Sequence, residues 1–257
     1  MSTRNTSKIN KLLQLQPPGV VLLSSWLSEH GYSLELQKRY RKSNWLESIG
    51  SGAMKRAGEK VDVTGALYAL QFQKEMSVHI GAKSALAYLG KVQYLELHSK
   101  KLYLFGNQNE KLPTWFNEHP WGLEVNYFST SFLPPDIGLT LIDVTTFQVK
   151  ISNAARAIME CLYLVPEKQP LLECYELMES LNNLPPGKVQ ALLEACNSIK
   201  VKRLFLYLAE KCKHNWFNHL KPEKIDLGSG KRSLAKNGTY VAKYQITVPK
   251  ELEEYGL

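Results

Sequence analysis

Residues 24–43 read SSWLSEHGYSLELQKRYRKS, which is the pattern of two short helices joined by a turn. Ser24 can cap the first helix, Gly31 interrupts the helical pattern, and Ser33 can cap the second helix. We expect the first helix to reach His30 and the second to occupy residues 34–43. The spacing therefore predicts a helix-turn-helix.

The second predicted helix has one apolar face and one charged face. Leu36 and Tyr40 are one turn apart and are expected to point into the core. Such an arrangement leaves the charged face available to enter the major groove of double-stranded DNA. The alternative is a solvated helix face that has no partner. The charged face carries one acid and three bases at positions i, i+3, i+4 and i+7: Glu35, Lys38, Arg39 and Lys42.

A short β-hairpin is predicted directly after the two helices. Residues 45–49 have strand character, residues 50–52 form a glycine-rich turn, and residues 53–56 return as a second strand. The hairpin would be the wing of a winged helix-turn-helix, with Trp45 in the core at its first corner and a base-stacking platform as the weaker alternative for this residue. The candidate DNA-binding residues come from the cap, the second helix and the wing: Ser33, Lys38, Arg39, Arg41, Lys42, Lys55 and Arg56.

Basic residues are concentrated in two zones of the chain. Residues 1–60 hold ten Lys/Arg against four Asp/Glu, a net charge of +6, and such a surface attracts a phosphate backbone. Residues 196–236 hold ten Lys/Arg against three Asp/Glu, a net charge of +7. This second zone could contact DNA, RNA or protein, or could be a merely solvated face. Its candidate surface residues are Lys200, Lys202, Arg203, Lys231, Arg232 and Lys236.

Helices and strands are mixed in the part of the chain that surrounds the winged helix. Ser7 can cap a first helix, and Asp62 can cap a later helix that reaches Met76. A further helix is expected over residues 83–89. Alternating apolar residues predict strands over residues 92–97, 102–105, 123–128 and 139–144.

From Ser152 onward the apolar period changes from two to about three and a half. Four successive helices are expected, the first of them capped by Asn153, and residues 240–249 return to strand character. The sequence therefore predicts an α+β fold of two domains. These are an N-terminal domain of residues 1–90, with the winged helix-turn-helix at about residues 6–60, and a mixed α/β C-terminal domain of residues 91–257.

Cysteine, histidine and glycine patterns argue against metal, redox and nucleotide chemistry. The four cysteines fall on apolar helical faces without a Cys-x-x-Cys pair, and we expect buried thiols. Cys212, His214 and His219 match no common zinc signature. Residues 227–231 resemble a phosphate loop, but Ile225 stands where a Walker A loop requires glycine. We expect a tight turn or a backbone-anion contact there, with a nucleotide-using enzyme as the weaker alternative.

Other signals of location and chemistry are missing from the sequence. No apolar run is long enough to span a bilayer, and the first residues lack the apolar core of a signal peptide. No catalytic motif is present. We therefore expect a cytoplasmic protein that is not an enzyme, has no cofactor or metal, and does not bind a membrane.

Four segments resemble the AbiEi family of type IV antitoxins. They are IGAKSAL at residues 80–86, SIKVKRLFLYLA at residues 198–209, KIDLGSGKR at residues 224–232 and YQITVP at residues 244–249. With the winged helix, the likeness covers nearly the whole chain. The C-terminal segments are fairly specific, whereas a winged helix is shared by many regulators.

The resemblance implies an antitoxin of an abortive-infection system that represses its own operon through an operator with inverted repeats. It also implies that a C-terminal antitoxin domain counteracts a nucleotidyltransferase-like toxin, without a need for a stable complex. The alternative is a winged-helix transcriptional regulator without a toxin partner, and the neighbouring genes would separate the two. Because the chain shows no heptad seam, we expect a monomer that binds two half-sites cooperatively.

Overall fold

The structure, a computed structural model, describes residues 8–91, 100–235 and 238–254 of the chain. The chain divides into two compact units that interleave along the sequence. Unit 1 comprises Met1–His79, Asn109–Glu124 and Leu141–Lys150, and unit 2 comprises Ile80–Gln108, Val125–Thr140 and Ile151–Leu257. The contiguous division into residues 1–90 and 91–257 stays a prediction.

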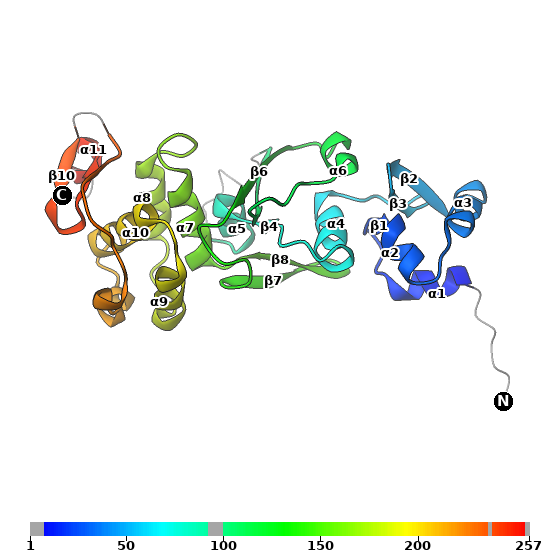
Figure 1. The fold of residues 1–257 in the computed structure, drawn as a ribbon, viewed down its shortest axis with the longest axis horizontal. Helices are drawn as coiled ribbons and strands as arrows, with labels where there is room; N and C mark the ends of the chain where they lie inside the picture. Colours follow the sequence, from blue (N-terminus) through cyan, green and yellow to red (C-terminus); the bar gives the residue numbers. More distant parts are fainter. Residues whose placement is uncertain (1–7, 92–99, 236–237, 255–257) are drawn as a thin grey trace. The chain divides into compact units, whose positions relative to one another are not determined.

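The N-terminal part of unit 1 is a winged helix-turn-helix, as the sequence predicts (Figure 1). Its strands form an antiparallel sheet in the order β1-β3-β2, in which Leu22 lies opposite Met54 and Leu46 lies opposite Arg56. We call β2, β3 and the turn between them the wing. The elements in chain order are α1 (Lys8–Leu15), β1 (Leu22–Leu23), α2 (Ser24–Glu29), α3 (Leu34–Lys42), β2 (Leu46–Gly50) and β3 (Ala53–Arg56).

Helix α4 (Val63–Tyr68) follows the wing and begins at the predicted cap. The Asp62 carboxylate accepts hydrogen bonds of 2.8 Å and 3.1 Å from the backbone N–H groups of Thr64 and Gly65. The helix continues as a π-helical segment, η1 (Ala69–Gln73), and so ends before the predicted Met76. The cap prediction is confirmed, while the predicted length is too great.

Two further contacts hold the wing and β1 within unit 1. The Gln73 side chain accepts from the N–H of Leu23 and donates to the carbonyl of Val21, both at 2.8 Å. Helix α6 (Thr114–Glu118), which was not predicted, lies against the wing so closely that a Cβ atom at Gly50 would stand 2.6 Å from the Trp115 Cβ. The glycine at residue 50 therefore allows this close approach.

A five-stranded sheet has the order β6-β5-β4-β8-β7. The predicted strands at residues 102–105, 123–128 and 139–144 are present, whereas the strand expected at residues 92–97 lies outside the described residues. β4 and β8 pair in parallel, with Ile80 opposite Ile151. The strands are β4 (His79–Ile80), β5 (Lys101–Asn107), β6 (Glu124–Thr130), β7 (Leu139–Val144) and β8 (Phe147–Ser152), of which β8 was not predicted.

Unit 2 is built mainly from helices that bury apolar faces. The four helices expected after Ser152 are present, and the Asn153 side chain caps the first by accepting from the Arg156 N–H at 2.9 Å. The principal helices are α5 (Ala82–Tyr88), α7 (Ala154–Leu164), α8 (Leu171–Glu179), α9 (Pro186–Ala195) and α10 (Ile199–Lys211). They are followed by η2 (Asn215–His219), η3 (Pro222–Lys224), β9 (Arg232–Ser233), β10 (Thr239–Val241), η4 (Ala242–Tyr244), β11 (Ile246–Val248) and α11 (Lys250–Glu254).

A buried polar network centres on Glu160 of α7, whose side chain is fully buried. Its carboxylate accepts from the Ala82 backbone N–H at 2.9 Å, the Ser152 hydroxyl at 2.7 Å and the Arg156 Nε at 2.9 Å. Arg156 also donates to the carbonyl of Pro134 at 2.7 Å. A buried charge requires such partners, so the network fixes α5, α7 and the loop before β7 together.

The four cysteines are free, as predicted. Cys161, Cys174 and Cys196 are buried, and Cys212 is half-buried. Burial raises the pKa of each of these thiols. They are therefore mostly packing residues with little thiolate at neutral pH.

Candidate nucleic-acid interface

Helix α3 is held against α2 by the buried side chain of Gln37. Its Nε2 atom donates to the Tyr32 carbonyl at 2.7 Å, and to the Ser24 carbonyl and the Ser28 hydroxyl at 3.1 Å each. Its Oε1 atom accepts from the Ser24 hydroxyl at 2.6 Å. Because one amide satisfies atoms of α2 and of the turn, Gln37 sets the position of α3.

Two local predictions about this motif need correction. Ser24 does not cap α2, because Leu23 is the cap residue and the Ser24 hydroxyl is bound to Gln37. Leu36 and Tyr40 are only half-buried, and the buried residue of α3 is Gln37. Gln37 was not among the predicted residues, although a glutamine beside the inward positions of an otherwise charged helix is a signal for such a role.

The outward side of α3 carries the predicted basic residues. Ser33 caps the helix as expected, with its hydroxyl accepting from the Leu36 N–H at 3.4 Å. Four cations and one acid, Glu35, are exposed, so the helix has a net charge of +3. Within the described residues, none of the four cations takes part in an ion pair, so the positive charge faces solvent. These cations are Lys38, Arg39, Arg41 and Lys42.

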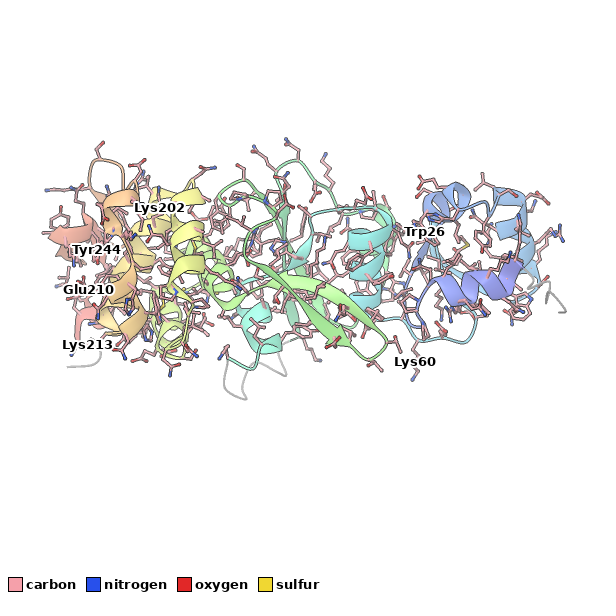
Figure 2. All side chains as sticks on the ribbon, turned by 90° about the horizontal axis from the view of Figure 1, so that it is seen from below. Trp26, Lys60, Lys202, Glu210, Lys213 and Tyr244 are labelled. Carbon is pink, nitrogen blue, oxygen red and sulfur yellow. The ribbon has the colours of Figure 1, made fainter. Side chains whose placement is uncertain are left out.

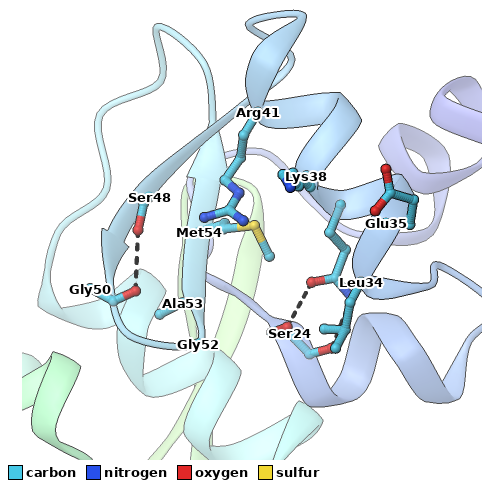
Figure 3. Close-up of a pocket in the computed structure, with 11 residues that line it drawn as sticks. Ser24, Leu34, Glu35, Lys38, Arg41, Ser48, Gly50, Gly52, Ala53 and Met54 are labelled. Atoms are coloured by element: carbon cyan, nitrogen blue, oxygen red, sulfur yellow. Dashed lines mark hydrogen bonds between the residues drawn. The ribbon is translucent and has the colours of Figure 1, made fainter.

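A groove separates α3 from the wing (Figure 3). On its helix side lie Leu34, Lys38 and Arg41, which are spaced at i, i+4 and i+7. On its wing side lie small residues and Met54, along which the Arg41 side chain extends in Figure 3. The wing-side residues are Ser48, Gly50, Gly52, Ala53 and Met54. The helix wall also carries Glu35, so it holds two cations and one carboxylate, whereas the wing wall is uncharged.

The two basic residues of the wing have partners within unit 1. The Lys55 ammonium lies 3.0 Å from the Glu47 carboxylate and donates to the Glu59 carbonyl at 2.7 Å. A hydrogen bond from the Gly58 backbone N–H, and to a lesser extent one from Lys55, lowers the pKa of the Glu47 carboxyl below its usual value. These contacts hold the base of the wing.

Arg56 binds the end of helix α1. Its Nη2 atom donates to the carbonyls of Leu13, at 2.9 Å, and Gln16. Its Nη1 atom lies 3.4 Å from the Glu59 carboxylate. The guanidinium therefore satisfies carbonyl groups at a helix C-terminus, where a cation is also favoured by the helix dipole. A contact of Lys55 or Arg56 with DNA stays a prediction.

Trp45 is exposed, contrary to the prediction that it lies in the core. Its side chain is 47% exposed. Asn44 before it has a positive φ of 54°, and the buried position at the start of β2 is taken by Leu46. Trp45 directly precedes the strand and points outward, next to the inward-pointing Leu46.

The second basic zone is only partly a surface. Lys202 is 4% exposed and Arg203 is 1% exposed, so neither is the surface residue that was predicted. The Arg203 guanidinium donates to the carbonyls of Leu227 at 2.8 Å, Gly228 at 3.1 Å and Gly230 at 2.7 Å. Arginine is buried here because it supplies the donors that these carbonyls need.

The same contacts define the loop at residues 227–231, where a tight turn or a backbone-anion contact was predicted. Its carbonyl oxygens, and not its amide groups, face the buried Arg203 guanidinium. A phosphate cradle needs converging N–H groups, whereas here the carbonyls converge on Arg203 and the Gly228 N–H donates to the Asp226 carboxylate at 2.8 Å. The observation also weakens the nucleotide-using alternative.

The remaining basic residues of this zone divide by exposure. Lys200 is half-buried and donates to the carbonyls of Tyr163 at 2.7 Å and Val165 at 2.6 Å, and burial lowers the pKa of its ammonium. Lys231 and Arg232 are exposed. Lys200 and Arg232 line one polar pocket, which brings two of the predicted residues together. Lys236 lies outside the described residues.

In the part of the chain that the structure describes, no group of three or more His, Cys, Asp or Glu residues is placed to hold a metal ion. No helix among the described residues combines the length and apolar character that a bilayer requires.

Comparisons with known proteins cover nearly the whole chain. Residues 99–249 match the family model of the transcriptional regulator AbiEi antitoxin of type IV toxin-antitoxin systems, and residues 5–97 match the model of the AbiEi antitoxin N-terminal domain. The crystal structure of the RV2827C protein from Mycobacterium tuberculosis is similar, with 13% identity and a TM-score of 0.55, over 93% of this chain and 89% of that one. At this identity the likeness concerns the fold alone. No curated protein matches the chain.

Proposed function

Because the chain belongs to the AbiEi family of transcriptional regulators, the antitoxins of type IV toxin-antitoxin systems, we propose that it represses its own operon by binding double-stranded DNA through α3. The family membership supports regulation and antitoxin activity as a class. The residues of α3 support the choice of DNA-binding element. Repression of its own operon is a more specific proposal than family membership, and DNA binding tests it.

The observation that carries this proposal is the exposed cationic side of α3. Lys38, Arg39, Arg41 and Lys42 stand on a helix that Gln37 holds in position. Free cations on a fixed helix can neutralise phosphates on both sides of a major groove and reach base edges between them. The wing lies next to this helix, which is the arrangement of a DNA-binding winged helix-turn-helix.

Binding to promoter DNA of the operon tests this proposal. If α3 neutralises about four phosphates, the logarithm of the affinity should fall with the logarithm of salt concentration with a slope of about −3.6. Lys38→Ala, Arg39→Ala and Lys42→Ala should each weaken binding, by about 1–3 kcal/mol where the side chain contacts a base edge. Lys74→Ala is the matched control, because Lys74 is an exposed lysine of unit 1 outside α3. Binding that is independent of salt, or equally weakened by Lys74→Ala, would contradict the proposal.

The antitoxin part of the proposal is that the protein counteracts a nucleotidyltransferase-like toxin without a need for a stable complex. Family membership supports this step. Co-expression with the product of the neighbouring gene tests it, with cell growth as the measurement. The Lys38→Ala variant should still protect cells when both genes are expressed from foreign promoters, because protection then does not depend on the operator.

A winged-helix regulator without a toxin partner remains the alternative. It would bind the same promoter DNA but would have no toxic neighbour. If the neighbouring gene product does not impair growth on its own, the alternative is favoured and the antitoxin step is withdrawn.

A further inference from the structure

Leu34 is the most exposed large apolar side chain among the described residues. It is 68% exposed and is the first residue of α3. The buried position of this helix is taken by Gln37, so Leu34 does not contribute to the core. An exposed leucine at a helix start adds nothing that a polar residue would not supply, since Glu, Gln or Lys have similar helix propensity. Leu34 is therefore free to contact a partner.

The surroundings of Leu34 limit what that partner can be. Lys38 and Arg41 lie one and two turns further along the same wall of the groove, which also carries Glu35, so cations outnumber carboxylates there (Figure 3). An apolar protein surface would have to bury both cations without partners, which is costly. A phosphate-bearing surface would pair with them and still needs one apolar group to meet the leucine.

Double-stranded DNA offers that combination in its major groove. The C5-methyl group of thymine is the apolar feature of the base edges there, and the flanking phosphates attract the cations. In helix-turn-helix proteins the N-terminal residues of the second helix contact base edges, and Leu34 is the first residue of that helix.

We propose that Leu34 reads the C5-methyl group of a thymine in each half-site of the bound DNA. The inference rests on the proposed function, because it requires that α3 enters the major groove. It names Leu34 as a specificity-determining residue, with Lys38 and Arg41 positioning the helix on the phosphates or neighbouring bases.

The test uses a duplex enriched from a random DNA library by the full-length protein. Each thymine of the enriched site is replaced in turn by deoxyuridine, which removes only the methyl group. At one position per half-site, the replacement should lower the affinity of the unaltered protein by about fourfold, the value for burying one methyl group. Leu34→Ala should bind the thymine and uracil duplexes equally.

Leu15→Ala is the matched control, because Leu15 is a 57% exposed leucine of α1. It should respond to deoxyuridine as the unaltered protein does. Circular dichroism checks that Leu34→Ala folds, which is expected because an exposed side chain contributes little to stability.

Four outcomes would overturn the inference. If no deoxyuridine position matters, or if the effect persists in Leu34→Ala, Leu34 does not read a methyl group although sequence-specific binding stands. If Leu34→Ala changes the sedimentation of the free protein and not its base preference, Leu34 serves contacts between copies of the chain. If no sequence is enriched at all, the proposed sequence-specific regulation fails together with the inference.

Discussion

The Oε1 atom of Gln37 accepts a 2.6 Å hydrogen bond from the hydroxyl of Ser24, which joins the second helix of the helix-turn-helix to the first. The Nε2 atom of the same amide binds three oxygen atoms of α2 and the turn. All acceptors and donors of this side chain are thus used inside the motif. The basic side of α3 depends on a neutral residue for its placement.

Gln37→Leu should destabilise the helix-turn-helix without changing the charge of α3. The substitution keeps a similar volume but leaves the Tyr32 carbonyl and the Ser24 hydroxyl without their partner. We expect a loss of about 1–3 kcal/mol in the free energy of unfolding, measured by urea denaturation, and weaker DNA binding as a consequence.

Lys38→Gln is the counterpart of this variant. Lys38 is exposed, so its replacement should leave the free energy of unfolding within about 0.5 kcal/mol while weakening DNA binding. If Gln37→Leu were as stable as the unaltered protein, Gln37 would not hold the two helices in the way that we describe.

Arg203→Met should destabilise unit 2 strongly, because it leaves several carbonyls of the 227–230 loop without donors. We expect a loss of about 3 kcal/mol in the free energy of unfolding and faster tryptic cleavage after Lys231. Arg203→Lys should be intermediate, because one ammonium cannot reproduce the planar fork of a guanidinium.

Arg232→Met controls for the loss of a positive charge in the same zone. Arg232 is exposed, so its replacement should change stability by no more than about 0.5 kcal/mol. If Arg232→Met were more destabilising than Arg203→Met, Arg203 would not be the buried donor that we describe, and the predicted surface role would be favoured.

The sequence predicted the structural features that depend on residues close together in the chain. Ser33, Asp62 and Asn153 are caps because each accepts from a backbone N–H two or three residues ahead. The wing and the helices of unit 2 follow in the same way from local periodicity.

Burial of individual polar and charged side chains was not predictable in this way. Arg203 meets its partners 24 to 42 residues further along the chain, and Gln37 is fixed by residues of the preceding helix. A count of basic residues does not reveal which of them fold inward, so the C-terminal zone looked like one surface. Trp45 was misplaced because its size favoured the core, whereas its neighbour Leu46 takes the buried position at the start of β2.

Stability should depend on pH through Glu210 of α10. Burial acts to raise the pKa of this carboxyl, but the Lys243 ammonium and the Tyr244 hydroxyl, the latter at 2.8 Å, outweigh it and lower the pKa below the usual 4.5 (Figure 2). A lowered folded-state pKa means that the carboxylate stabilises the fold above pH 4.5 and loses this contribution as pH falls through the lowered value.

Glu210→Gln should therefore reduce the free energy of unfolding at pH 7, and the difference from the unaltered protein should shrink as pH falls below 4.5. The effect is small, because an exposed ion pair contributes at most about 1 kcal/mol. Urea denaturation at several pH values measures it. Glu223→Gln, at an exposed glutamate of η3, is the control. A difference for Glu210→Gln that stays constant down to acidic pH would contradict this account.

Occupancy of the operator should be cooperative. One winged helix buries only about 600–1,000 Å² of protein surface on DNA, which gives limited specificity, so two half-sites in an inverted repeat would supply the rest. We expect a monomer in free solution, measured by sedimentation, and tighter binding to a duplex with two half-sites than independent sites would give. Scrambling one half-site, with the length of the duplex unchanged, should remove the cooperative gain and leave weak binding at the other. A stable dimer in free solution, or equal and independent filling of the two half-sites, would show that copies of the protein do not assemble on DNA in this manner.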